Sequence, residues 1–288
     1  MSIVARPVDS ELGRWTHTEW RPRPGDALES MVERIWDFDG MAAAPRERVF
    51  PDGGIELILQ LDDHYLDVDG LHTRPTPAVC ATGIHSRAIV VQAPPRPCRV
   101  LGVRLQPAGA WSLLAHPLAE LAEVTVDLGN LLGREASELA ERCDDARGGI
   151  ARVSQVLQWL RGRYARVPAG GSADPAAQWV AHRIRASGGT QPIGRLRETA
   201  GLSDARLLAL FRQQVGVTPK RYARILRLHQ ALTLLSGPGI SLVRVAHQAG
   251  YYDQPHMNAE FRALAGVTPR EFLAGVRFPE SLSRPEFA

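Results

Sequence analysis

The chain contains few cysteines and almost no lysine. Its 288 residues include Cys80, Cys98 and Cys143, which lie far apart and form no C-x-x-C pair. This pattern excludes a disulfide framework and a cysteine-based zinc cluster. Of the 34 lysines and arginines only Lys220 is a lysine. We attribute this bias, in a chain rich in alanine, glycine and proline, to the base composition of the gene.

Long apolar segments and paired histidines are also missing. The N-terminus has no apolar core of the signal-peptide type, and no run of about 18 apolar residues occurs. We therefore expect a cytoplasmic protein with no membrane partner. The first half has no H-x-H pair, and His17-Thr18-Glu19 is its close pairing of a histidine with a carboxylate. We expect no metal or cofactor and no enzyme, and a cupin-like metalloenzyme is kept as an alternative.

The charge is divided unevenly along a chain long enough for two domains. Residues 171–288 hold 15 basic and 8 acidic residues, a net charge of +7. The total of +3 leaves −4 for residues 1–170. A basic C-terminal part suits contact with DNA phosphates, although a solvated surface would give the same signal.

The most informative feature is an internal repeat. The segment FRQQVGVTPKRY, from Phe211 to Tyr222, returns 50 residues later as FRALAGVTPREF, from Phe261 to Phe272. Upstream, AGLSD at Ala200 matches AGYYD at Ala249 with a shift of one residue. A period of this length is typical of a duplicated supersecondary unit.

Each copy has the signals of helix, tight turn and helix. Gly201 and Gly250 stand where a left-handed residue ends a helix, and Ser203 and Asp253 stand where a cap begins the next. The Gly-Val-Thr-Pro string that follows ends one helix and opens another. In a helix-turn-helix the second helix enters the DNA major groove. We expect these recognition helices over about 203–214 and 253–265.

A single long helix is expected between the copies. Residues 219–236 keep their apolar side chains on one helical face. Eighteen helical residues extend about 27 Å, which is comparable with the length of about 34 Å of one turn of B-DNA. Two helices joined in this way can enter successive major-groove segments on one face of the duplex.

These features resemble a known family. The shared residues are Gly201-Leu202-Ser203, Phe211-Arg212, Gly216-Val217-Thr218-Pro219, Arg227-Leu228, Gly250-Tyr251, Asp253-Gln254 and Gly266-Val267-Thr268-Pro269. The last third of the chain is thereby similar to the AraC/XylS family of bacterial transcription regulators. The resemblance implies double-stranded DNA as a partner and RNA polymerase as a possible one. It also implies a β-rich first domain that senses a small-molecule effector, forms a homodimer, or both.

The resemblance further implies which side chains read bases. At positions where the family often has large polar side chains that contact bases, the first unit has alanine and leucine. Arg206 is therefore its one strong candidate for a base contact, with a solvated helix residue as the alternative. Glutamine and asparagine in the second unit suit an adenine edge. His256 either contacts a base or packs against the start of its helix. We predict that the second unit carries most of the base specificity. The expected base readers are Asp204, Ala205, Arg206, Ala209, Gln254, His256, Asn258 and Ala259.

Phosphate contacts are expected at helix openings and from basic side chains nearby. Such contacts position the protein on DNA without specifying its sequence. The expected residues are Ser203, Arg212, Thr218, Lys220, Arg221, Arg262 and Arg270.

The first half has period-two alternation broken by turns, as in Ile55, Leu57, Leu59 and Leu61. This favours an antiparallel barrel or jelly roll, with helices after Pro107 and a helix over 26–36. The fold class is therefore α+β, with an all-α C-terminal domain. The expected boundaries are 1–166 for the sensor domain, 167–174 for a linker, 175–278 for the DNA-binding domain and 279–288 for a tail.

Two further sites in the first half are expected only weakly. Aromatic side chains and a pair of charged ones are candidates for a ligand pocket, with a structural core or a solvent face as the alternative. They are Trp15, Trp20, Phe50, Glu56 and Arg104. A stripe on the helix over 149–164 is a candidate dimer seam, or packs on its own domain. It contains Ile150, Val153, Leu157, Leu160 and Tyr164. The alternative function is a protein-interaction module with degenerate DNA binding.

Overall fold

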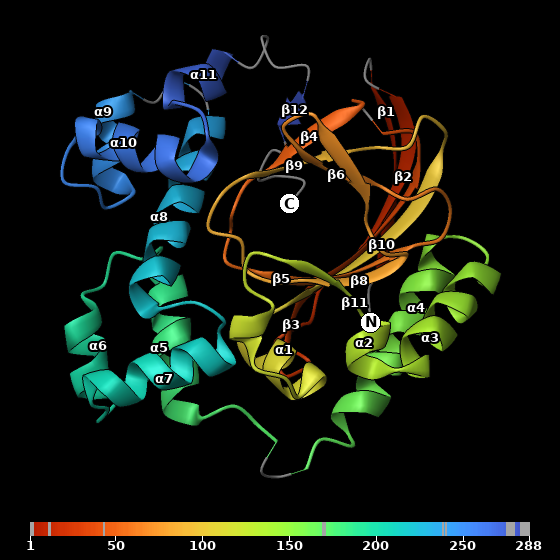
Figure 1. The fold of residues 1–288 in the computed structure, drawn as a ribbon, viewed down its shortest axis with the longest axis horizontal. Coiled ribbons are helices and arrows are strands. Elements are labelled where there is room, and N and C mark those ends of the chain that lie inside the picture. The colour runs from red at the N-terminus through yellow and green to blue at the C-terminus, as the bar shows by residue number, and fades with distance from the viewer. Residues whose placement is uncertain are drawn as a thin grey trace.

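The structure is a computed structural model that describes residues 3–10, 13–42, 44–168, 171–237, 239, 241–274 and 280–282. Residues 169 and 170 of the expected linker lie outside this range, as do 275–278 of the expected DNA-binding domain and 279 and 283–288 of the expected tail. A β-rich half and a helical half lie side by side (Figure 1).

The N-terminal half contains two sheets that curve around a common interior (Figure 1). The larger sheet has seven strands in the order β1-β2-β3-β10-β5-β8-β11, all antiparallel. They are β1 (Ile3–Ser10), β2 (Gly13–Trp20), β3 (Val32–Gly40), β10 (Cys98–Leu105), β5 (Ile55–Gln60), β8 (Val79–Thr82) and β11 (Thr125–Asp127). The expected α+β class with an antiparallel, barrel-like first domain is confirmed.

The smaller sheet has five strands in the order β12-β4-β9-β6-β7. They are β12 (Glu280–Leu282), β4 (Arg46–Val49), β9 (Ile89–Gln92), β6 (Leu66–Asp69) and β7 (His72–Pro75). Part of the expected tail therefore adds a strand to the first domain, because β12 pairs with β4 in parallel.

The apolar core of this half lies between the larger sheet and the helices, not inside the barrel. Alternate residues of the central strands, such as Leu57, Leu59, Leu101 and Val103, are fully buried beneath the helices. The helical elements are α1 (Pro107–Leu114), the 3-10 helix η1 (Leu118–Glu120), α2 (Gly129–Leu132), α3 (Arg134–Asp145) and α4 (Gly149–Tyr164). The barrel interior is consequently lined by the opposite face of each strand.

The prediction of a helix over 26–36 is wrong. A turn closes with Val32 N donating to Leu28 O at 2.8 Å, and β3 then begins at Val32. The register of β3 against β10 shifts so that Leu105 pairs with Val32 and Arg104 with Arg34. This bulge brings Val32 and Ile35, three residues apart, into the same core. It thereby imitates the apolar spacing of a helix.

The expected dimer seam on α4 is occupied by the protein's own core. Val153, Leu157 and Leu160 are at most 1% exposed and belong to the cluster beneath the sheet. The Tyr164 hydroxyl donates to Gly109 O at 3.0 Å. Only Ile150, 53% exposed, faces outward. The period of three and four reflects packing on the sheet, so this face is not available to a second copy.

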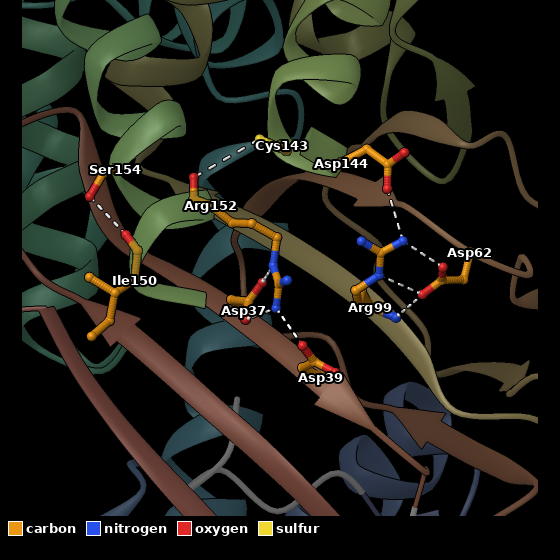
Figure 2. A network of polar contacts seen from close by, with 9 residues as sticks. All are labelled: Asp37, Asp39, Asp62, Arg99, Cys143, Asp144, Ile150, Arg152 and Ser154. Atoms are coloured by element: carbon orange, nitrogen blue, oxygen red, sulfur yellow. Dashed lines mark hydrogen bonds and ion pairs between the residues drawn. The ribbon is translucent and has the colours of Figure 1, made fainter. Parts of the chain in front are cut away.

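A buried ion pair fastens α4 to the sheet. Arg152 donates to both carboxylate oxygens of Asp37 on β3, at 2.6 and 2.9 Å, and to Asp39 at 2.7 Å. Arg152 and Asp37 are 2% and 0% exposed. Burial alone would lower the pKa of Arg152, but the carboxylates of Asp37 and Asp39 outweigh it and raise the pKa. The guanidinium therefore stays charged. Figure 2 shows the guanidinium reaching from the helix onto the strand.

The C-terminal half consists of helices joined by short turns. They are α5 (Pro175–Ala186), α6 (Ile193–Thr199), α7 (Asp204–Gln214), α8 (Pro219–Ser236), α9 (Leu242–Gln248), α10 (Gln254–Ala265) and α11 (Pro269–Ala274). The two recognition helices and the long connecting helix thus lie where the sequence predicts them.

The apolar cores do not divide at residues 167–174. One cluster runs continuously from the sheet and α1–α4 into α5–α7 and the first turns of α8, as far as Leu226. The second begins at Leu228 and includes α9–α11, with Phe50 as its contribution from the first half. The first helix-turn-helix therefore shares a core with the β-rich half, whereas the second has a separate core to which the β-rich half adds only Phe50 and the partly buried Ala88.

Candidate DNA interface and sensor domain

The first helix-turn-helix is formed by α6 and α7. Gly201 has φ of 66°, in the left-handed region that favours glycine. The Ser203 side chain then accepts a hydrogen bond from Arg206 N at 3.2 Å and caps α7. Leu207 and Phe211 are buried, which leaves the opposite side of α7 open to solvent.

The second unit, α9 and α10, repeats this construction. Gly250 has φ of 78°, and Asp253 accepts a hydrogen bond from His256 N at 2.7 Å. Arg224 of α8 donates to both oxygens of Glu260 at 2.7 and 2.9 Å. This bidentate pair fixes α10 against the connecting helix.

The structure leaves most expected base readers accessible. On α7, Asp204, Ala205, Arg206 and Ala209 are exposed. On α10, His256 and Ala259 are exposed, whereas Gln254 and Asn258 are half-buried. The two units therefore present one open face each.

Most of the expected phosphate contacts lie at helix openings, whereas Arg212 and Arg262 lie in the last turns of α7 and α10. Thr218 accepts a hydrogen bond from Arg221 N at 3.2 Å and caps α8. Its counterpart Thr268 forms a reciprocal capping box with Glu271, at 2.7 and 3.2 Å. Thr218 is half-buried; the other expected phosphate contacts, Ser203, Arg212, Lys220, Arg221, Arg262 and Arg270, are exposed.

His256 makes the helix-start contact that was its alternative role. Its ring packs edge-on against Tyr251, with centroids 5.5 Å apart, and Nδ1 accepts a hydrogen bond from Tyr252 N at 3.4 Å. Tyr252 itself is 90% exposed beside the start of α10, and sequence reasoning missed it. The signal was the one-residue shift between the repeats, because Tyr252 is the residue by which the second turn is longer.

Two basic side chains of the first unit and α8 form ion pairs in the structure. Arg206 lies 3.5 Å from the carboxylate of Asp174, which caps α5. Arg221 lies 3.6 Å from Glu123, a residue of the β-rich half with φ of 65°. Exposed pairs of this kind contribute little stability, so both arginines remain available to phosphate or bases.

The β-rich half also contacts the connecting helix and α5. Arg185 of α5 donates to Gly53 O, to Glu33 and to the Tyr222 hydroxyl, at 3.1, 3.1 and 3.2 Å. Glu33 lies 3.8 Å from Arg104 of β10. The strand β10 and the helix α8 are thus connected through the charged side chains of Glu33 and Arg185 and the Tyr222 hydroxyl.

The second unit is contacted by the loops around β4 and β9. Ala88 N donates to Leu264 O at 2.7 Å, and the rings of Phe50 and Phe272 meet edge-on with centroids 5.7 Å apart. The second unit and the connecting helix α8 therefore both touch the first half.

The structure separates the expected pocket residues. Trp20 and Phe50 belong to the two apolar cores, at 2% and 7% exposure, so they are not pocket walls. Glu56 and Arg104 are direct partners on β5 and β10, facing the barrel interior, and Trp15 is half-buried near Phe38, with ring centroids 6.1 Å apart. The alternative prediction, that Glu56 and Arg104 face solvent, is therefore wrong.

A separate pocket of about 610 Å³ lies between the two halves. Asp26, Gln106, Trp179 and His182 are among its lining residues, and none of the expected pocket residues is.

The described residues contain neither a membrane-spanning helix nor a metal-binding cluster. No helix among them is long and apolar enough to cross a membrane. No group of three or more histidine, cysteine, aspartate or glutamate side chains in the same residues is arranged to hold a metal ion.

Residues 196–275 match the family model of a helix-turn-helix domain. The chain is 36% identical over 83 residues to the arabinose operon regulatory protein of Salmonella typhimurium, across 29% of this chain and 30% of that protein. A longer match, 28% identical over 125 residues, joins 43% of this chain to 37% of the transcriptional activator RhaS of Escherichia fergusonii. The C-terminal region is an AraC/XylS-type domain.

The chain spans about a third of the length of these relatives. Residues 21–127 match a second family model, a domain of unknown function (DUF6597). Among solved structures, ToxT from Vibrio cholerae O395 is 11% identical, with a TM-score of 0.47 over 83% of this chain and 97% of that one. The C-terminal domain of AraT from Geobacillus stearothermophilus is 20% identical over 35% of this chain and 86% of that one, with a TM-score of 0.33.

Proposed function

We propose that the protein is a sequence-specific DNA-binding transcription regulator. The observation that carries this proposal is the pair of capped recognition helices, α7 and α10, held on one connecting helix with six of the eight expected base readers exposed. The basic charge of this half and the exposed Lys220 and Arg221 beside the opening of α8 suit the phosphate backbone. RNA polymerase is then a further partner.

The second unit is proposed to supply most of the base specificity. Gln254 and Asn258 of α10 have the amide groups that match an adenine edge, whereas α7 offers mainly Arg206. The exposed ring of Tyr252 adds a contact beside the groove.

A small-molecule effector is proposed to act through the β-rich half. Support comes from the contacts of this half with the helical half, through Arg185 of α5 to Gly53 and through Ala88 to Leu264 of α10. An effector that binds two arrangements of these contacts unequally shifts the balance between them.

Fluorescence anisotropy of the full chain on its own upstream intergenic DNA tests this function. A scrambled duplex of equal length is the control, and both are titrated at two salt concentrations. We expect tighter binding to the native duplex and a loss of affinity with salt. Equal affinity for both duplexes would indicate a generic basic domain. An absence of binding, with and without candidate effectors, would favour the protein-interaction module.

A further inference from the structure

The pocket between the two halves has walls from both. The turn before β3 and the start of α1 supply one wall and α5 supplies the other, where the two halves meet (Figure 1). Its volume of about 610 Å³ lies within the range of about 300–1,000 Å³ of small-molecule sites. The small side chains of Ala108, Ala173, Ala177 and Ala181 are among its lining residues. They leave space for an organic molecule.

The charge of this pocket is negative. Glu29 accepts a hydrogen bond from Gly25 N at 2.7 Å, and no basic side chain of the described residues pairs with it. Asp26 also lines the pocket and lies 3.5 Å from Arg161. The guanidinium among the lining residues, that of Arg185, already donates to protein groups through all three of its nitrogens. The pocket therefore attracts a positive charge and repels an anion.

Two glutamines add unpaired acceptors to this wall. Gln106 Nε2 donates to Glu29 O, and Gln178 Nε2 donates to Ala173 O, both at 2.9 Å. These bonds fix the orientation of both amides, and neither Oε1 accepts a hydrogen bond from a described residue. An ammonium group has three donors and no acceptor. It therefore matches a set of two amide oxygens and a carboxylate.

Trp179 gives the pocket an aromatic surface. The side chain lies beside Gln178 on α5 and is 39% exposed. Arg183 Cζ lies 6.0 Å from the centroid of its ring, so this indole already attracts one cation. The same ring can contact both the charged nitrogen and the hydrocarbon part of a bound amine.

We propose that this pocket binds an organic amine, with its ammonium group beside Glu29 and its apolar part against Trp179 and the alanines. Charge, acceptor groups and aromatic surface all select the same chemical class. The effector role of this amine rests on the proposed function, whereas its binding does not require that the protein bind DNA.

The pocket extends to the end of the first recognition helix. Gln214, the last residue of α7, lines it and is 8% exposed. Its Oε1 accepts a hydrogen bond from Asp174 N at 2.8 Å, and its Nε2 has no acceptor among the described residues. Tyr222 of α8 lines the same pocket. A ligand held by Glu29 therefore contacts both halves and stabilises the docking of the first helix-turn-helix on the β-rich half.

Isothermal titration calorimetry of the full chain without DNA tests the proposal. The probes are 2-phenylethylamine, tryptamine and hexylamine, each compared with the neutral alcohol of the same carbon skeleton, and phenylacetate is the anionic counterpart of the first. Because hydrogen bonds to a charged group are roughly twice as strong as neutral ones, we expect the alcohols to bind about tenfold more weakly or worse. Phenylacetate should not bind.

Three variants locate the site. Glu29→Gln removes the carboxylate charge, and Glu138→Gln is its matched control, because Glu138 is exposed on α3 and does not line the pocket. Trp179→Ala removes the aromatic surface. We expect amine binding to weaken at least about threefold in E29Q and about two- to fivefold in W179A, and not to change in E138Q.

The outcomes are distinct from those of the DNA experiment. Binding of at least one amine, weaker for its alcohol and for E29Q but not for E138Q, supports the proposal. No binding of any amine, equal binding of amine and alcohol, or undiminished binding to both E29Q and W179A overturns it. The comparison of amine with alcohol uses wild-type protein, so it decides the question even if a variant fails to fold. A chain that binds the amine but no DNA would retain this site and lose only the proposed function.

Discussion

Substitution of Arg152 by methionine should destabilise the protein severely. The change removes the partner of Asp37, which is 0% exposed and would remain as an uncompensated buried charge. Breaking a buried pair in this way costs about 3–5 kcal/mol. At about 2–4 °C per kcal/mol for a domain of this size, the midpoint of thermal unfolding should fall by roughly 6–20 °C. Circular dichroism during heating measures this shift.

A matched control exists on the protein surface. Arg96 pairs with Asp63 at 2.6 Å, but the two side chains are 75% and 44% exposed. Because exposed pairs contribute about 0–1 kcal/mol, Arg96→Met should lower the midpoint by only a few degrees. Asp37→Asn in the R152M background should recover part of the loss. Equal effects of R152M and R96M would refute the reasoning.

Three other outcomes are expected. Gln254→Ala should lower the preference for the native duplex by about 1–3 kcal/mol, and more than Arg206→Ala does; equal losses in anisotropy would contradict this. Lys220→Ala should weaken binding to native and scrambled duplexes alike and reduce the salt slope by about one. Although burial opposes it, Arg104 holds the pKa of Asp52 at about 2, below its ordinary 3.8. The resulting stability is present above pH 4 and lost as pH falls toward 2, so Asp52→Asn should flatten acid unfolding in that window.

The helical half was predictable because its signals are local. Ser203, Asp253 and Thr218 cap helices within a few residues of themselves, and Gly201 and Gly250 end helices where the sequence places them. The repeat then doubles each signal, so even the limits of α8 follow from the sequence.

The β-rich half was less predictable because its determinants are distant in sequence. Arg152 and Asp37 are 115 residues apart, and neither suggests the other. The bulge opposite Arg104 exists only once β3 has paired with β10, which is why the segment around Ile35 resembles a helix.

The continuity of the first apolar cluster limits how the protein can be divided. Gly216 packs so closely on the η1 backbone that a Cβ there would lie 2.8 Å from Leu118 O, and Val215 lies in the same cluster. A fragment that began at Pro175 would uncover this surface to water, and we expect it to aggregate on expression. The glycine- and proline-containing segment before α5 has the composition of a domain linker at which the chain could be truncated. The β-rich half nevertheless covers apolar surface of the first helix-turn-helix that would otherwise be exposed to water.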